Sequence, residues 1–384
     1  MRKACVNVCR LLLAVTFILS GYVKAIDPLG TQYKIADYLE AMHLGGLLSD
    51  FVVLGASVVQ AAVEFCLGIF LLFAIRRRLT SKLILLIMVV MTPLTLWLAL
   101  ENPISDCGCF GDAIVLTNWQ TFWKNVVLLA CAVVVARWPM EMFRFVSKSN
   151  QWIVINYSAL FILINSTYCL YDLPTFDFRP YHVGVNLRQE WQRTMEGEDL
   201  PYADFFIEET ATGEDITEQV LGDAGYTFLL VSPTLEQADD SRFDLLNELY
   251  EYANEHGYPF YCLTASTPQH IVRWQESTGA EYPFCLTDGT TLKTVIRSNP
   301  GLLLLKDGVI IRKWSHNDLP AIADDQTGLP LEKMSYGQMP TDSAPKRILK
   351  LLLWFVLPLT LLALADRTWM WTKWLRRRRE TTSE

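Results

Sequence analysis

Residues 83–118 read LILLIMVVMTPLTLWLALENPISDCGCFGDAIVLTN, a mostly apolar run followed by a loop that carries two cysteines one glycine apart. Crossing the ~30 Å hydrocarbon core of a bilayer takes roughly 20 mostly apolar residues in a helix. The run is long enough to span, and another apolar segment begins directly after the loop. We therefore predict two membrane helices joined by a loop that holds a thiol pair.

Four segments before or after these two are similarly long and apolar, in a chain of 384 residues that is 51% hydrophobic and 19% charged. Lipid offers backbone amides no hydrogen-bond partner, so membrane-spanning segments of this kind are helical. The six predicted spans are 9–26, 51–75, 79–100, 119–137, 152–170 and 348–365. We expect the first to be retained rather than cleaved as a signal peptide, because 21–25 is a poor small-residue cleavage site.

The predicted fold class is an α-helical membrane bundle with an inserted α/β soluble domain. Its four parts follow the apolar segments along the chain. They are a four-helix domain at 1–150, a fifth helix at 151–170, a soluble domain with linkers at 171–345, and a sixth helix with a basic tail at 346–384.

Lys and Arg cluster on one side of the predicted helices. Cytoplasmic loops carry such an excess, and the clusters lie around residues 2–10, 76–82, 137–148 and 376–379. Both termini are therefore expected in the cytoplasm of a bacterial cell, with the chain in the inner membrane. The Cys-Gly-Cys loop and residues 171–345 are expected on the outer, periplasmic side.

Charge also limits the partners. Residues 171–345 contain 29 acidic and 11 basic residues, a net charge of −18. Nucleic acid, itself a polyanion, is an improbable partner for this surface. We expect the lipid bilayer and exported or membrane proteins as partners instead.

The Cys107-Gly108-Cys109 sequence is predicted to be a redox pair. A disulfide between residues i and i+2 closes a small strained ring, and strain makes a disulfide easier to reduce. Two alternatives remain open: a tether from this loop to Cys169, or a metal site completed by His43 or Asp106. We predict no metal, since two thiolates are an incomplete site. Cys169, at the outer end of the fifth helix, is also a candidate resolving thiol.

Glu64 is the second candidate site residue. Ionisable groups inside a membrane are costly and so are functional candidates by default. Glu64 could relay protons to a quinone-like acceptor, which makes quinone the one cofactor considered, with none certain. Alternatively, it could pair with Lys24 or Lys124 inside the bundle.

The soluble segment alternates strand and helix patterns. Apolar strands are predicted at 226–231, 258–264 and 282–286, with amphipathic helices at 240–256 and 267–278 between them. A hairpin is predicted at 301–314, because Asp307-Gly308 is a strong two-residue turn signal.

Residues 1–170 resemble the DoxX and MauE-like family of redox-associated membrane proteins. The matching stretches are 20–28 (SGYVKAIDP), 34–39 (KIADYL), Glu64 with Gly68, and 107–112 (CGCFGD) followed by 118–122 (NWQTF). The resemblance implies help with thiol chemistry or with the maturation of exported proteins. Two further helices and a soluble domain depart from the family pattern.

Residues 200–320 resemble the thioredoxin-like fold. Asn299-Pro300 stands where that fold keeps a cis-proline, but Ser232-Pro233-Thr234-Leu235 replaces its Cys-x-x-Cys. The domain is thus degenerate, and a Cys262–Cys285 disulfide is a remaining possibility. The resemblance implies a peptide groove, so Asn299, Pro300, Ser232 and Pro233 are candidate substrate-binding residues.

Together these features predict a membrane protein that supports thiol–disulfide exchange or maturation of exported proteins through Cys107 and Cys109. A thioredoxin-like domain would dock the substrate. A maturation scaffold without redox turnover is the alternative. A small-molecule transporter is a weaker one, because broken-helix pairs and polar midplane residues are missing.

Overall fold

The computed structural model describes residues 1–104, 106–198, 200–323, 327–341 and 344–383, and for 344 and 375–383 the backbone alone. The side chains of the basic run 376–379 therefore lie outside the described part. The chain forms two compact units, Met1–Leu170 with Ala344–Glu384, and Tyr171–Ser343.

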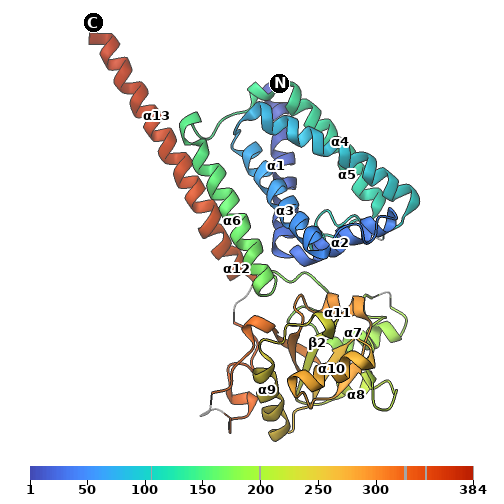
Figure 1. Ribbon diagram of the computed structural model, residues 1–384. Helices are drawn as coiled ribbons and strands as arrows, with labels where there is room; N and C mark the ends of the chain where they lie inside the picture. The colour runs from blue at the N-terminus through green and yellow to red at the C-terminus, as the bar shows by residue number, and fades with distance from the viewer. Residues whose placement is uncertain (105, 199, 324–326, 342–343, 384) are drawn as a thin grey trace. The chain divides into compact units, whose positions relative to one another are not determined.

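The first unit consists of long helices (Figure 1). Six helical segments of the described chain are long and apolar enough to cross a membrane, which confirms the predicted helical membrane architecture. The helices are α1 (Arg2–Ile26), α3 (Asp50–Leu72), α4 (Arg77–Glu101), α5 (Asn118–Arg137), α6 (Gln151–Tyr171), and a last span built from α12 (Ala344–Leu351), η7 (Leu352–Val356) and α13 (Leu357–Ser383).

Helices α1 and α3 run antiparallel in close contact because glycines face the partner backbone. A Cβ placed on Gly68 would lie 2.7 Å from the backbone nitrogen of Ile18, and one on Gly21 would overlap the backbone of Phe65. Small residues permit such close approach of helices in membranes. The contact fixes the C-terminal half of α1 against the C-terminal half of α3.

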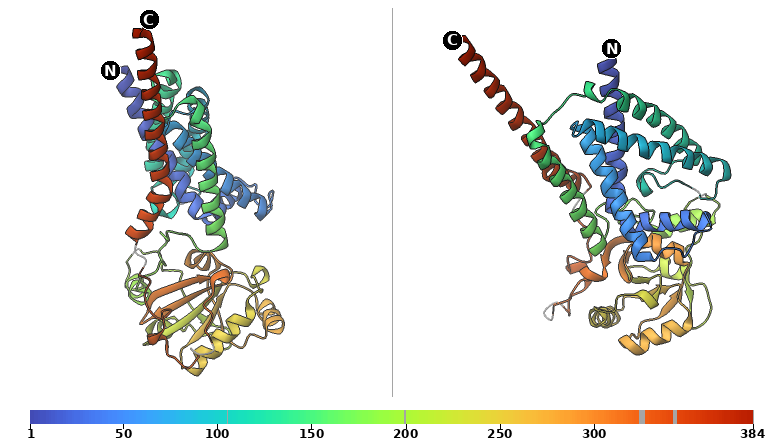
Figure 2. Two further views of the ribbon diagram at one scale, coloured as in Figure 1. Left: turned by 90° about the vertical axis from the view of Figure 1, so that its left-hand side faces the viewer. Right: turned by 45° about the horizontal axis from the view of Figure 1, so that its top comes forward.

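Helix α6 and the last span lie side by side in both views (Figures 1 and 2). Aromatic rings join the two segments to each other and to α3. The ring centroids of Phe161 on α6 and Phe355 on the last span are 4.3 Å apart, and those of Phe355 and Phe65 on α3 are 5.2 Å apart. Ser147, in the loop before α6, donates a 2.7 Å hydrogen bond from its backbone N–H to the carboxylate of Asp366 on α13.

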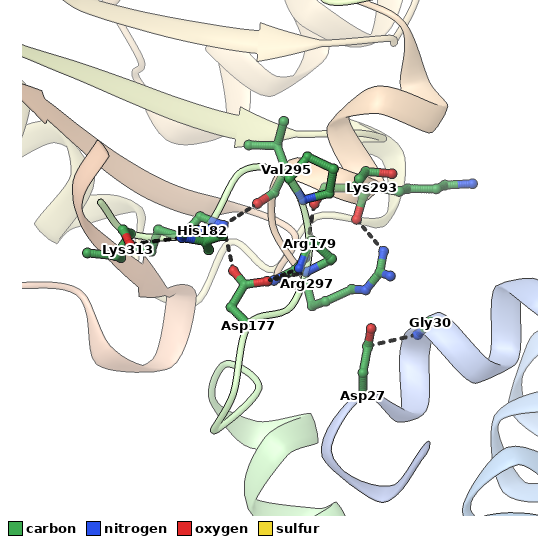
Figure 3. A network of polar contacts seen from close by, with 12 residues as sticks. Asp27, Gly30, Asp177, Arg179, His182, Lys293, Val295, Arg297 and Lys313 are labelled. Atoms are coloured by element: carbon green, nitrogen blue, oxygen red, sulfur yellow. Dashed lines mark hydrogen bonds and ion pairs between the residues drawn. The ribbon is translucent and has the colours of Figure 1, made fainter. Parts of the chain in front are cut away.

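A helix that the sequence did not predict, α2 (Pro28–Ala41), follows α1 directly. Asp27 caps its first turn by accepting a 2.9 Å hydrogen bond from the N–H of Gly30 (Figure 3). Pro28 occupies the first helical position, where its missing N–H costs nothing. The sequence of this helix alternates polar and apolar residues, so it does not form a continuous apolar segment of the kind that predicts a membrane helix.

The second unit contains a six-stranded sheet in the order β1-β4-β3-β2-β5-β6. β2 and β3 are parallel, whereas β2, β5 and β6 alternate in direction. This arrangement is that of the thioredoxin-like fold, and the peptide bond Asn299-Pro300 is cis as predicted. The strands are β1 (Glu208–Glu209), β2 (Tyr226–Ser232), β3 (Phe260–Thr264), β4 (Phe284–Leu286), β5 (Gly301–Lys306) and β6 (Val309–Ser315).

Helices cover both faces of this sheet. Apolar side chains of α9 and α10 form one core, and those of α7, α8 and α11 form the other. The predicted hairpin is present, with positive φ angles at Asp307 (51°) and Gly308 (77°). The helices are α7 (Leu187–Met195), α8 (Thr217–Gly222), α9 (Phe243–Glu255), α10 (Pro268–Thr278) and α11 (Gly289–Val295).

The Cys262–Cys285 disulfide that the sequence left possible is wrong. In the parallel β3–β4 register, Cys262 lies opposite Phe284 and Leu263 lies opposite Cys285. Successive side chains of a strand point to opposite faces, so one thiol is buried in each core. Both cysteines are free thiols.

A buried charge network ties the start of this unit to the sheet (Figure 3). Asp177 accepts a 2.7 Å hydrogen bond from Arg179 and a 2.9 Å bond from Lys313 of β6. These two cations hold the pKa of Asp177 well below its usual range despite burial. Lys313 also donates to the carbonyl of Val295 at 2.5 Å, so the segment before α7 is fixed to β6 and α11.

Candidate functional site

The thiol pair lies in the loop between α4 and α5, and both ends of that loop are fixed. Helix α4 ends at Asn102 in the left-handed conformation (φ 48°), and Thr117 caps α5 in a reciprocal capping box with Gln120. Asn118 donates 2.8 Å hydrogen bonds to the Asn102 side chain and to the carbonyl of Ile104. The loop is therefore closed at its base.

Within the loop, the sulfurs of Cys107 and Cys109 are 2.9 Å apart and share a hydrogen bond. Both are free thiols, and Cys107 is buried. Gly108 adopts a positive φ of 64°, which an L side chain rarely takes. Its N–H donates a 2.7 Å bond to the Asp106 carboxylate, and this tight turn brings the two sulfurs together.

Helix α2 packs against the outside of the turn. Tyr38 donates a 3.0 Å hydrogen bond to the carbonyl of Cys107, and Lys34 forms a 3.0 Å ion pair with Asp106. A Cβ on Gly108 would lie 2.8 Å from the Lys34 side chain. The residue between the cysteines thus needs to be glycine for two reasons, its backbone conformation and the contact with Lys34.

Helices α1 and α3 supply a polar cluster on the other side of the turn. Lys24 forms an ion pair with Glu64, at 2.7 and 2.8 Å to the two carboxylate oxygens, and its side chain is only 6% exposed. The hydroxyl of Ser20 lies 2.7 Å from Glu64, 2.7 Å from the carbonyl of Cys109 and 3.1 Å from the Lys24 ammonium. The single hydroxyl proton of Ser20 can be donated either to the Glu64 carboxylate or to the Cys109 carbonyl, but not to both at once.

Of the alternatives for Glu64, the pairing with Lys24 is thus confirmed. Lys124 instead places its ammonium 4.4 Å from the centre of the Phe110 ring. Gln60 completes the coordination of the carboxylate with a 3.1 Å hydrogen bond. Glu64 is not an isolated charge in mid-membrane, because Ser20 links it to the Cys-Gly-Cys turn. A role in proton transfer stays a prediction.

The two thiols differ in acidity. The hydrogen bond from Cys107, supported by the positive charges of Lys124 and Lys24, lowers the pKa of Cys109 to about 6 although burial raises it. The same hydrogen bond together with burial raises the pKa of Cys107. The directions of the two pKa shifts make Cys109 the thiol of this pair that ionises first, because only one of two interacting acids ionises easily.

The remaining candidates of this region are placed less directly. Cys169 is buried near the end of α6, and the charged and polar groups that act most strongly on Cys107 and Cys109 come from α1, α2, α3 and α5. Its role as a resolving thiol stays a prediction. Among the described residues, no group of three or more His, Cys, Asp or Glu side chains is arranged to hold a metal ion, and Asp106 is paired with Lys34.

The cis-proline region of the thioredoxin-like unit is hydrogen-bonded to itself. Ser232 donates a 2.7 Å bond to the Asn299 side chain, which donates a 2.8 Å bond to the carbonyl of Thr234. The carbonyl of Asn299 accepts a 2.9 Å bond from the N–H of Asp239. These groups are used within the domain, so peptide binding at Asn299, Pro300, Ser232 and Pro233 stays a prediction.

Sequence reasoning did not assign roles to Ser20, Lys34 and Tyr38. All three fall within the stretches 20–28 and 34–39 that carry the family resemblance. That resemblance was the available signal. Without the position of α2, nothing in the sequence indicated that these stretches converge on the cysteines.

The N-terminal helical region matches a known protein family. Residues 2–137 match the family described as methylamine utilisation protein MauE. The match contains α1 to α5 and the whole Cys-Gly-Cys site, and it ends before α6, so it is shorter than the predicted 1–170. Comparison with curated proteins finds no match.

Among solved structures, the solution structure of a proposed protein disulfide isomerase from Bacteroides thetaiotaomicron is similar to part of the chain. It is 17% identical, with a TM-score of 0.26, and the alignment covers 30% of this chain and 77% of that one. The fold assignment of the soluble unit rests instead on its own strand order and cis-proline.

The chain is thus a membrane protein in which a MauE-like helical region is joined to a thioredoxin-like α/β domain. This combination supports a redox-associated role at the membrane.

Proposed function

We propose that this protein carries out thiol–disulfide exchange at the outer face of a bacterial inner membrane, with Cys109 as the attacking thiol and Cys107 as the resolving thiol. The observation that carries the proposal is the 2.9 Å approach of two free thiols of opposite pKa shift. The thiolate is the nucleophile in disulfide exchange, so the more acidic Cys109 attacks first.

The exchange proceeds in two steps. The Cys109 thiolate attacks one sulfur of a substrate disulfide, forming a mixed disulfide as the substrate S–S bond breaks and its leaving sulfur takes up a proton from water. Cys107 then loses its proton and attacks Cys109, which forms the Cys107–Cys109 disulfide and releases the substrate dithiol. The pair is oxidised by two electrons and the substrate is reduced by two; exchange with the dithiol of another protein reverses the change.

The surroundings of the pair suit this chemistry. Gly108 and Tyr38 hold the backbone of the turn, so little rearrangement separates the dithiol from the disulfide. The thioredoxin-like unit has no cysteine pair in its usual place, because Ser232 to Leu235 occupy it. Electron exchange is therefore assigned to the membrane unit alone.

Topology and partners belong to the same proposal. The distribution of Lys and Arg supports cytoplasmic termini, with the Cys-Gly-Cys loop and the thioredoxin-like unit outside. Exported or membrane proteins with disulfides are then the accessible substrates. We infer that the soluble unit recognises them; the cis-proline edge at Asn299, the candidate surface for this, is hydrogen-bonded within the domain.

Trapping of mixed disulfides tests the proposal. In Cys107→Ser, Cys109 can attack but nothing resolves the intermediate, so covalent adducts with exported proteins should accumulate on non-reducing gels. In Cys109→Ser, far fewer adducts should form. Equal trapping by both variants would remove the assignment of roles, and stronger trapping by Cys109→Ser would reverse it. No trapping by either would favour a maturation scaffold that binds without redox turnover.

A further inference from the structure

Two ion pairs of the described residues lie beside the Cys-Gly-Cys turn. Facing the sulfurs are Lys24 and Glu64 from α1 and α3, and Lys34 and Asp106 from α2 and the loop. Each of these two pairs is neutral, with ion-pair distances of 2.7 and 3.0 Å. Tyr38 faces Cys107 as a neutral phenol, donating to its carbonyl, and Asp112 follows on the short turn after Gly111.

Lys124 of α5 belongs to neither of these two pairs. Among the ion pairs of the described residues none involves Lys124. Its ammonium lies 4.4 Å from the ring centre of Phe110, the residue directly after Cys109. An aromatic face attracts a cation but does not neutralise it, and the positive charge of Lys124 is one of those that lower the pKa of Cys109.

We propose that Lys124 is the counter-ion of the Cys109 thiolate and that it thereby stabilises the reduced state of the pair. This inference rests on the proposed function of Cys107 and Cys109. Phe110 acts as the platform that holds the ammonium in place. Lys124 acts on the thiolate through its charge alone, whereas Lys24 already has a carboxylate partner.

The redox consequence follows from charge balance. Reduction of the Cys107–Cys109 disulfide takes up two electrons and one proton and yields one thiol and one thiolate. The negative charge of Cys109 exists only in this reduced form, so the cation at Lys124 favours reduction. Removing the cation should therefore make the pair harder to reduce, and the effect should vanish at a pH low enough to protonate Cys109 in every variant.

The test is the pH profile of Cys109 alkylation in the full chain in detergent, followed by mass spectrometry of the peptide that contains it. A nearby opposite charge lowers the pKa of an acid by about 1–3 units, and Lys124 is one of the charges that lower the pKa of Cys109. In Lys124→Met, we expect the pKa of Cys109 to rise by about one unit or more, whereas Lys124→Arg should keep the wild-type profile. Lys82→Met, which removes a cation early in α4, is the matched control and should change nothing.

The second measurement is the reduction potential of the pair. With a thiolate pKa about one unit higher, the equilibrium constant for reduction at pH 8 should fall almost tenfold, which corresponds to about 30 mV for a two-electron couple. At pH 5 the wild type and Lys124→Met should have the same reduction potential, because Cys109 is then protonated in both. Lys124→Gln provides the same comparison if the methionine variant does not fold.

An unchanged alkylation profile and an unchanged potential in Lys124→Met or Lys124→Gln would overturn the inference. Both measurements are made on the isolated chain without any substrate. They can therefore succeed even if no mixed disulfide is ever trapped, so failure of this inference and failure of the exchange function are separate results.

Discussion

The ion pair between Lys24 and Glu64 yields the sharpest stability prediction. Its partners are 6% and 13% exposed, and the carboxylate also accepts hydrogen bonds from Ser20 and Gln60. Replacing Glu64 by Gln leaves the Lys24 ammonium buried without its counter-ion. Replacing Lys24 by Met leaves the carboxylate with two neutral donors. Each single variant is expected to lose about 3–5 kcal/mol of unfolding free energy, the usual cost of breaking a buried pair.

The double variant Lys24→Met/Glu64→Gln is the informative one. It contains no buried charge at this position, so it should cost no more than either single variant. The coupling free energy of the cycle is then at least about 3 kcal/mol, the smaller of the two single losses, which is at the upper end of the range for contacting residues. Unfolding of the full chain in mixed detergent micelles measures all four free energies, with Lys82→Met as an exposed-cation control.

Additive losses would refute this reasoning. If the loss of unfolding free energy in the double variant equalled the sum of the two single losses, each side chain would stabilise the bundle independently. The 2.7 Å ion pair between Lys24 and Glu64 would then contribute no coupling. A related expectation concerns the turn itself: because Ser20 joins Glu64 to the carbonyl of Cys109, the single variants should also change the Cys109 alkylation rate.

Three further substitutions test the packing and the soluble unit. Gly68→Ala should cost about 1–3 kcal/mol through overpacking against Ile18, whereas Gly55→Ala on the same helix, with no atom within 4 Å of the added Cβ, should be neutral or stabilising. Gly108→Ala should cost about 1–2 kcal/mol of unfolding free energy for its left-handed backbone, and more because the added Cβ clashes with Lys34. Gly46→Ala is the control for the backbone cost, since Gly46 has a φ of 75° and no atom within 4 Å of an added Cβ. Equal losses in the two variants would show that the clash with Lys34 contributes nothing. Asp177→Asn should weaken the soluble unit. Because the folded pKa of Asp177 lies below its unfolded value of about 3.9, its contribution is present above that pH and disappears as the pH falls through the folded pKa. The stability of the soluble unit, measured by urea unfolding of the full chain with limited proteolysis as the readout, should therefore fall less steeply with decreasing pH in the variant than in the wild type. The same acid dependence in both proteins would contradict the stabilising role of Asp177.

The large features of the fold were predictable because they depend on local patterns. Six apolar runs of sufficient length can only be helices in a membrane. Asp307-Gly308 can adopt positive φ angles at both turn positions, so the hairpin follows from two residues. The cis-proline was available through family resemblance at Asn299-Pro300.

The missing features depend on register and on contacts between distant segments. Whether Cys262 could meet Cys285 depended on a shift of one residue between two parallel strands, which no local pattern sets. The choice of Lys24 over Lys124 as partner of Glu64 required the crossing of α1 and α3. Helix α2 was overlooked because its polarity is mixed, and with it the contacts of Lys34 and Tyr38 with the cysteine turn.

The central claim is that Cys107 and Cys109 exchange electrons with a disulfide as one unit. The most direct measurement mixes the reduced full chain, reconstituted in lipid nanodiscs, with an oxidised dithiol peptide and counts products by mass spectrometry. We predict one Cys107–Cys109 disulfide for each peptide dithiol released, and no release by the Cys107→Ser/Cys109→Ser variant. Release that persists in the double serine variant, or none from the wild-type chain, would contradict the claim.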